Sequence, residues 1–201
     1  MRNNFVEIIN DKFTNKTTTK MKTKFCLKDS GLIDKDSFVI GLRHVSMPAG
    51  DILVLDINYD GDDWFFLRQG ELIININNVE NMVLKPKESY TDTYTSYHDV
   101  HCVESDYYEL TQEQLKRICE ANTIDVKITG RDHFEVFHVN KFIIYAQQFY
   151  NAVYDSNAYQ ESLKMGYDGT SGDNCCIVTL LMIFSTLSTL LTCIALIMGV
   201  I

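Results

Sequence analysis

The chain has 201 residues, of which 46% are hydrophobic and 22% charged, and its formal net charge is −9. These averages exclude a disordered chain, a collagen-like chain and a polytopic membrane protein. The acidic balance also argues against nucleic acid as a partner, because a nucleic-acid-binding surface needs a basic face. The charges are unevenly placed, since the last charged residue is Asp173 and none follows in 174–201.

Alternation of apolar and polar residues dominates 19–139 and predicts β-strands. The predicted strands cover 20–27, 37–47, 51–59, 64–67, 71–77, 82–84, 100–110, 124–128 and 133–139. Tight turns such as Asp60-Gly61 join several of them, which favours an antiparallel meander. The segment 86–97 is polar and rich in turn-forming residues, so we interpret it as a surface loop.

Two helices are predicted among the later strands. Thr111 and Gln114 form a capping-box pattern in front of a helix that ends near 120 or 121. A second helix is predicted from Asn140 to Val153, where apolar residues recur at helical spacing. The sequence therefore predicts an α+β fold, mainly an antiparallel β-sheet or sandwich with two helices, over 1–155. Residues 156–173 contain Gly, Ser and Asp and are interpreted as a flexible linker.

The C-terminal segment 174–201 predicts one transmembrane helix. Residues 176–199 are long enough to cross a hydrocarbon core, and their only polar side chains are hydroxyls. The alternative is a very apolar helix buried in an oligomer. Because no signal-peptide pattern precedes the domain, we expect a single-pass, C-terminally anchored protein whose soluble domain lies in the cytoplasm and whose anchor contacts membrane lipid.

Small residues recur within the apolar segment, and such a stripe favours close packing of two helices and thus a homo-oligomer. They are Ser185, Ser188, Thr189 and Thr192. The alternative is that hydroxyl residues are simply scattered through this stretch. The domain itself carries Cys26, Cys102 and Cys119, an odd number without the spacing of a disulfide framework, which is typical of a reducing compartment.

Three short motifs accompany the predicted elements. They are D-x-F-T at 11–14, Y-x-L-T-x-E-Q-L at 108–115 and V-x-I-x-G at 126–130. With these motifs, residues 5–153 resemble small β-rich domains of uncharacterised bacterial proteins that are associated with the cell envelope. The resemblance implies a β-rich domain held at the envelope, and it implies no catalytic residues. The chain departs from these proteins in lacking an N-terminal export signal and in carrying its apolar segment at the C-terminus.

Two groups of residues are candidate metal ligands. Asp56, Asn58 and Asp60-Gly61 match the start of a calcium loop, but the twelfth position is Leu67 instead of an acid, and a hairpin turn explains the same residues. The second group consists of histidines and one cysteine, which zinc prefers. Its members are His98, His101, Cys102, His133 and His138. On strands these side chains diverge, so the alternative is ordinary surface histidines, and we expect no cofactor.

An alternative function is a metal-dependent or thiol enzyme built on His98, His101 and Cys102. The sequence contains none of the G-x-S-x-G, P-loop or G-x-G-x-x-G motifs. Packing on the apolar side of a helix accounts for Cys119. We therefore expect a protein that is not an enzyme.

Two sets of residues are candidate contact surfaces. Lys20, Lys22 and Lys24 share one face of a predicted strand. They either protect a sheet edge from aggregation or bind an acidic partner or an anionic lipid surface. The second set, Tyr90, Tyr94 and Tyr97, lies in the predicted loop 86–97. These tyrosines either contact a partner or pack the loop onto the sheet.

The main functional expectation is a membrane-anchored, non-catalytic binding or scaffolding module with a protein partner. A further alternative is an exported envelope domain.

Overall fold

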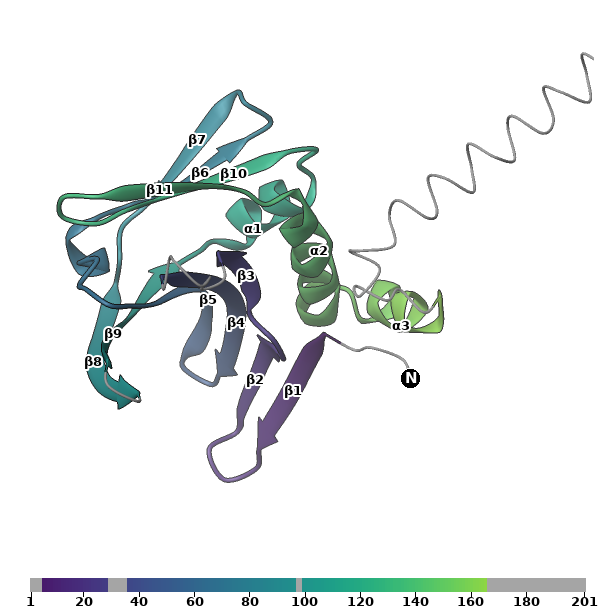
Figure 1. The fold of residues 1–201 in the computed structure, drawn as a ribbon. Helices are drawn as coiled ribbons and strands as arrows, with labels where there is room; N and C mark the ends of the chain where they lie inside the picture. Colours follow the sequence, from purple (N-terminus) through teal and green to yellow (C-terminus); the bar gives the residue numbers. More distant parts are fainter. Residues whose placement is uncertain (1–4, 29–35, 97–98, 166–201) are drawn as a thin grey trace, which may run out of the picture. The chain divides into compact units, whose positions relative to one another are not determined.

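A computed structural model of the chain describes residues 5–28, 36–96 and 99–165. These residues build two antiparallel sheets and three α-helices (Figure 1). The larger sheet has the order β1-β2-β4-β5-β9-β8, and β3 pairs with one end of β4. Its strands are β1 (Val6–Asp11), β2 (Lys16–Met21), β3 (Phe25–Lys28), β4 (Ser37–Met47), β5 (Gly50–Gly61), β8 (Glu88–Ser96) and β9 (Asp99–Glu109). The α+β class and the antiparallel pairing predicted from the sequence are thus confirmed.

The smaller sheet has the order β11-β10-β6-β7. Its strands are β6 (Leu72–Ile76), β7 (Glu80–Leu84), β10 (Ile124–Thr129) and β11 (Phe134–His138). The helices are α1 (Gln112–Cys119), α2 (Asn140–Tyr154) and α3 (Ser156–Met165), and a 3-10 turn, η1, covers Leu67–Gln69.

One hydrophobic core joins the two sheets. On the larger sheet, the buried residues Phe38, Ile40 and Leu42 of β4 lie opposite buried residues of β5. The Phe38 ring packs 5.5 Å from the ring of Phe137 on β11, which brings the inner faces of the sheets into contact. The predicted alternation therefore marks a real boundary between a buried face and a solvent face.

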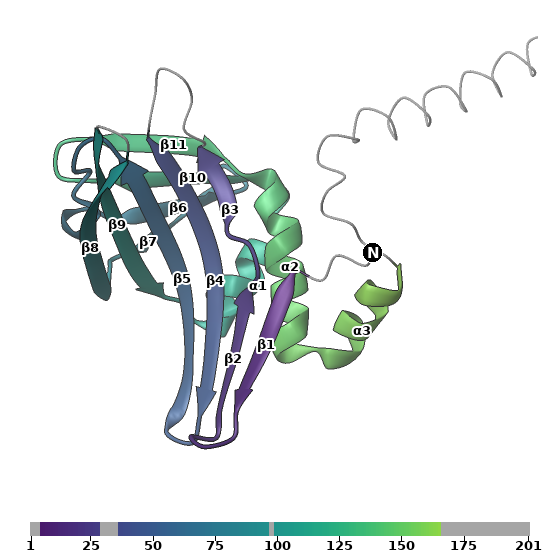
Figure 2. The same ribbon diagram turned by 60° about the horizontal axis from the view of Figure 1, so that its bottom comes forward.

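The helices cover the same inner face as the smaller sheet. Phe142, Ala146 and Phe149 of α2 are buried, and Phe142 contacts Phe25 of β3 with ring centroids 5.8 Å apart. Figure 2 shows α1 and α2 behind the larger sheet, together with the strands of the smaller sheet. No described helix lies over the outer face of the larger sheet.

The first predicted helix is confirmed in detail. Thr111 Oγ1 accepts a hydrogen bond from the Gln114 N–H at 3.1 Å, and Gln114 Oε1 accepts one from the Thr111 N–H at 2.8 Å. These two bonds satisfy two N–H groups at the start of α1. The second predicted helix is confirmed as α2.

The segment 86–97 is not a surface loop over most of its length. Residues Glu88–Ser96 form β8, which pairs with β9 without a register shift. The strand was missed because Ser, Thr and Tyr occupy both of its faces, which leaves no apolar alternation to detect.

Within the predicted linker 156–173, Ser156–Met165 forms the helix α3, and residues 166–173 lie outside the described part of the chain. Asp155 starts this helix, since its Oδ1 accepts a hydrogen bond from the Ala158 N–H at 3.0 Å. Tyr159 is only 6% exposed and joins the hydrophobic core. Tyr159, the partly buried Leu163 and the Asp155 cap thus hold this largely polar helix against the core.

The predicted strand 20–27 is two strands. β2 ends at Met21 and β3 begins at Phe25, and the Lys22 N–H donates to the Phe5 carbonyl at 2.8 Å in the break between them. The predicted strand at 64–67 is likewise replaced by an irregular segment that leads into η1. Among the residues described by the structure, no helix is long and apolar enough to span a membrane, and the predicted transmembrane residues 174–201 lie outside that part.

Candidate functional site

The outer face of the larger sheet is built from the alternate residues of β4 and β5 that do not enter the core. Arg43 lies opposite Val54, and Val45 lies opposite Ile52. Val54 is buried, whereas Ile52 is 40% exposed. The outer face therefore combines aliphatic side chains with a cation at its centre.

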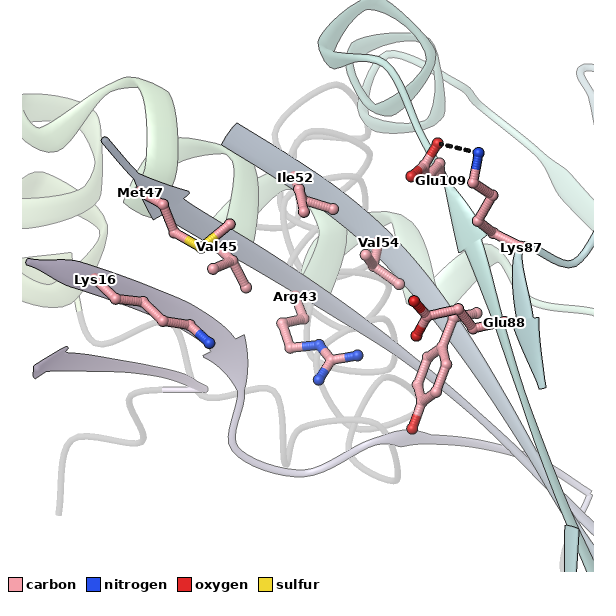
Figure 3. A pocket seen from close by; sticks show the side chains of 10 residues that line it. Lys16, Arg43, Val45, Met47, Ile52, Val54, Lys87, Glu88 and Glu109 are labelled. Atoms are coloured by element: carbon pink, nitrogen blue, oxygen red, sulfur yellow. Dashed lines mark ion pairs between the residues drawn. The ribbon is translucent and has the colours of Figure 1, made fainter. Parts of the chain in front are cut away.

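A groove of about 280 Å³ opens on this face (Figure 3). Its lining comes from five strands and from the segment before β8, and consists of Lys16, Arg43, Val45, Met47, Ile52, Val54, Lys87, Glu88, Tyr107 and Glu109. In Figure 3 the three aliphatic residues Val45, Ile52 and Val54 lie between Lys16 on one side and Lys87 and Glu109 on the other. The groove thus has an apolar floor and charged sides, as ligand sites commonly do.

A second hollow of about 190 Å³ shares Arg43 and Tyr107 with the groove. It is also lined by Lys24, Gly41 and Asp56. The Arg43 guanidinium carbon lies 5.0 Å from the centre of the Tyr107 ring, so this stacked pair separates the two hollows. Arg43 makes no ion pair within residues 5–28, 36–96 and 99–165.

The candidate lysines do not form a stripe on an edge strand. β2 lies between β1 and β4, and Lys20 on β2 pairs with Glu7 of β1 at 3.3 Å. Lys22 is exposed in the break after β2, and Lys24 points to the outer face, where it pairs with Asp56 at 2.6 Å. Lys20 lies on an interior strand, and Lys22 and Lys24 lie between β2 and β3, so the three lysines do not line one edge strand as edge protection requires.

The candidate calcium ligands lie on the outer face of β5 and already have partners. The Lys24 ammonium contacts Asp56 Oδ2 and Asn58 Oδ1, each at 2.6 Å. Asp60 accepts a hydrogen bond from the Tyr94 hydroxyl at 2.8 Å. The three residues belong to a regular strand and not to a metal-binding loop.

Asp60, Tyr94 and His101 meet on three neighbouring strands. His101 Nδ1 lies 3.2 Å from Asp60 Oδ1, and its ring stacks on the Tyr94 ring with centroids 4.8 Å apart. The hydrogen bond to Asp60 raises the pKa of Tyr94, because it favours the protonated hydroxyl. Two candidate metal ligands, Asp60 and His101, and one candidate contact tyrosine are thus brought together, in a contact that neither pattern predicted.

The remaining metal and thiol candidates are dispersed. Cys102 faces inward, opposite to His101, and burial raises the pKa of its thiol. The His138 imidazole contacts Asp125, whereas the His133 ring packs against Phe65. Within the described ranges, no three His, Cys, Asp or Glu residues are grouped as a metal site. His98 and Tyr97, as well as the small residues predicted to pack in the membrane, lie outside those ranges.

β8 forms one edge of the larger sheet (Figure 1). Its outward-facing residues Tyr90 and Tyr94 are 55% and 45% exposed. The strand contains no lysine, arginine or proline, and its ladder with β9 has no bulge. The strand thus carries the acidic residues Glu88 and Asp92 but lacks lysine, proline and a bulge, three of the devices that protect a sheet edge.

A row of buried polar residues on the inner face of β9 was missed by the sequence analysis. Glu104 accepts hydrogen bonds from the backbone N–H groups of Phe65, Phe66 and Leu67, at 2.6, 2.8 and 2.7 Å. Asp106 is 1% exposed, and its Oδ2 has no hydrogen-bond partner in the described part of the chain. The sequence does contain a sign of this row: acidic residues occupy the positions of the strand that the alternation pattern assigns to the core.

Comparison of the chain with protein-family models, curated proteins and solved structures finds no match. Arg43 was not a candidate in the sequence analysis, because one arginine within an apolar strand gives no motif.

Proposed function

We propose that the protein is a membrane-anchored, non-catalytic protein-binding module whose contact surface is the outer face of the larger sheet together with the edge strand β8. The single observation that carries the proposal is β8 itself. One edge of this nine-residue strand pairs with no other strand in the described part of the chain, and exposed tyrosines lie beside that edge.

Such an edge accepts a strand from another protein. Main-chain hydrogen bonds supply affinity in this mode of binding, and side chains beside the edge supply specificity. Tyr90 and Tyr94 offer large contact areas with a polar end, at a low cost in side-chain entropy. The buried thiols support a non-catalytic role, because burial raises the pKa values of Cys102 and Cys119 and so depletes the reactive thiolates.

The anchoring part of the proposal is supported by the sequence of 174–201, which contains no charged residue. In this proposal the segment crosses the membrane once and the β-rich domain faces the cytoplasm. Deleting 174–201 should move the protein from the membrane fraction to the soluble fraction. A truncated protein that still sediments with membranes would overturn the anchor.

The binding part is tested by site-specific photo-crosslinking in the full-length protein. A photoreactive residue replaces Tyr90 on one face of β8 or Thr91 on the other, and Glu161, exposed on α3, is the control position. We expect both β8 positions to crosslink the same protein and position 161 not to do so. Crosslinking of that protein equally from position 161, or no crosslinking from β8, would contradict the proposal.

A further inference from the structure

The groove beside β8 has features that identify the chemistry of a ligand. We infer that it binds an extended peptide segment of the protein partner that carries an acidic side chain two residues away from a branched aliphatic one. This inference rests on the proposal that the outer face is a protein-binding surface, and it names what that surface recognises.

The Arg43 guanidinium has no carboxylate partner within the described residues. Three other cations of the outer face have carboxylate partners: Lys20 pairs with Glu7, Lys24 with Asp56, and Lys87 with Glu109. Lys16, at one side of the groove, resembles Arg43 in making no ion pair within the described residues, so it adds positive charge to the same site. Among the described residues, Arg43 contacts the face of the Tyr107 ring and no carboxylate, which leaves the edge of its guanidinium available to an acceptor. In a chain of net charge −9, a half-buried arginine without a carboxylate is suited to one supplied by a ligand.

An apolar floor lies beside this arginine. Val45 follows Arg43 by two residues on β4 and lies opposite Ile52 of β5. Ile52 is 40% exposed and Val45 half-buried, so an aliphatic side chain placed there would remove apolar surface from water. The carboxylate and the aliphatic group of the ligand must therefore project from the same side of the ligand.

An extended peptide meets this condition, because its side chains at positions i and i+2 point to the same side. The two hollows also follow β4 from Gly41 to Met47, with the Arg43–Tyr107 stack between them. This stretch of strand is about 20 Å long, which matches roughly six residues of extended chain. A small carboxylic acid would occupy only one of the two hollows.

The test is selection from a library of random short peptides on the purified full-length protein, followed by fluorescence-anisotropy titration of the enriched peptides. We expect enrichment of peptides with Asp or Glu two residues before or after Val, Ile or Leu. Arg43→Gln should weaken their binding by roughly tenfold or more, since it removes a charge-assisted bidentate hydrogen bond. Ile52→Thr should weaken binding by loss of apolar contact while keeping a residue with strand propensity.

Arg131→Gln is the matched control, because the Arg131 guanidinium also stacks on an aromatic ring, 3.9 Å from the centre of Phe66, but lies outside the groove. This variant should bind the peptides as the wild type does. Thermal unfolding of each variant shows whether the fold is retained, and Arg43→Lys, which keeps the charge, should bind better than Arg43→Gln.

Three results would overturn the inference: enrichment of basic or aromatic peptides, no enrichment at all, or equal binding to the wild type and to a folded Arg43→Gln variant. If any of these results is found while Tyr90 and Thr91 positions still crosslink a protein, the assignment of the groove is wrong and the proposed binding module stands. If the peptides bind the groove but β8 crosslinks nothing, the proposed strand addition fails and the groove chemistry is retained.

Discussion

Glu104 fixes the backbone of Phe66: its Oε1 accepts the Phe66 N–H at 2.8 Å, where Phe66 has a left-handed conformation with φ 63°. The carboxylate lies inside the core at 2% exposure and also accepts the N–H groups of Phe65 and Leu67. A buried carboxylate on β9 thus organises the connection between β5 and β6, in which an aromatic residue adopts a conformation that side chains disfavour.

Replacing this carboxylate should destabilise the domain. Glu104→Gln leaves one carbonyl oxygen for three N–H donors and buries an amide NH2 group, so we expect the free energy of unfolding to fall by about 2–4 kcal/mol. Urea unfolding followed by circular dichroism measures this change. Glu109→Gln, on the exposed side of the same strand, is the control and should change stability by less than about 0.5 kcal/mol.

Gly41 provides the space for the Lys24–Asp56 ion pair. A Cβ at position 41 would lie 2.6 Å from Asp56 Oδ1 and 3.2 Å from Lys24 Cγ. We expect Gly41→Ala to lower the free energy of unfolding by about 1–3 kcal/mol, because the pair must shift to accommodate the methyl group. The cost should be smaller in an Asp56→Ala background, which removes the clashing oxygen, and an equal cost in both backgrounds would disprove this explanation.

Asp106 should make stability depend on pH. Burial raises the pKa of its carboxyl group above the ordinary value of 3.8, and the negative charge of Glu104 raises it further. A Ser89 hydrogen bond and the positive charge of Arg68 lower this pKa but do not cancel the rise. The folded protein therefore binds this proton more tightly than the unfolded chain does. The resulting stabilisation is complete at low pH and is lost as the pH rises through the raised pKa.

Asp106→Asn removes this titration. We expect the stability of the variant, relative to the wild type, to increase as the pH is raised from about 4 to about 7. Chemical unfolding at several pH values measures the difference. A difference that stays constant or decreases over this range would contradict the assignment, and Asp132→Asn, at an exposed position, controls for the loss of a carboxylate.

The cysteines of the domain should differ strongly in reactivity. Cys26 is exposed, whereas burial raises the pKa of Cys119 to about 12 and also raises that of Cys102. Because the thiolate is the reacting species, we expect alkylation by iodoacetamide to modify Cys26 first and Cys119 last, with rates that differ by a factor on the order of 100 or more. Peptide mass spectrometry of the timed reaction measures the order, and rapid modification of Cys119 in folded protein would contradict its burial.

The strands with one buried and one solvent face could be predicted from the sequence, since β4, β5, β6 and β10 alternate clearly. Alternation does not show which strands pair, so the separation into two sheets could not be predicted. β1 was missed because its central residues Ile8 and Ile9 are both largely exposed, which breaks the pattern. Pairing with β2, and not the local sequence pattern, therefore makes this segment a strand.

The candidate site was predicted only in fragments. Four residues that the sequence marked as candidates do take part in contacts, but not in the predicted ones: Lys24, Asp60, Tyr94 and His101. Their partners are distant in sequence: Lys24 meets Asp56, and Tyr94 meets Asp60. Arg43 is a candidate because its guanidinium stacks on Tyr107 of another strand and has no nearby carboxylate among the described residues. Both features depend on residues that are distant in sequence, so the residues next to Arg43 do not reveal them.

The order of the strands also governs when the domain can fold. After β5 the chain leaves the larger sheet to form the β6–β7 hairpin, returns for β8 and β9, and then completes the smaller sheet with β10 and β11. The larger sheet is therefore complete only at Glu109 and the smaller sheet only at His138, and the apolar faces of β4 and β5 pack against strands and helices that extend beyond residue 120. A nascent chain released or cleaved before that point would expose unpaired strands. The first two thirds of the domain are therefore the part that most needs to be bound by chaperones during synthesis.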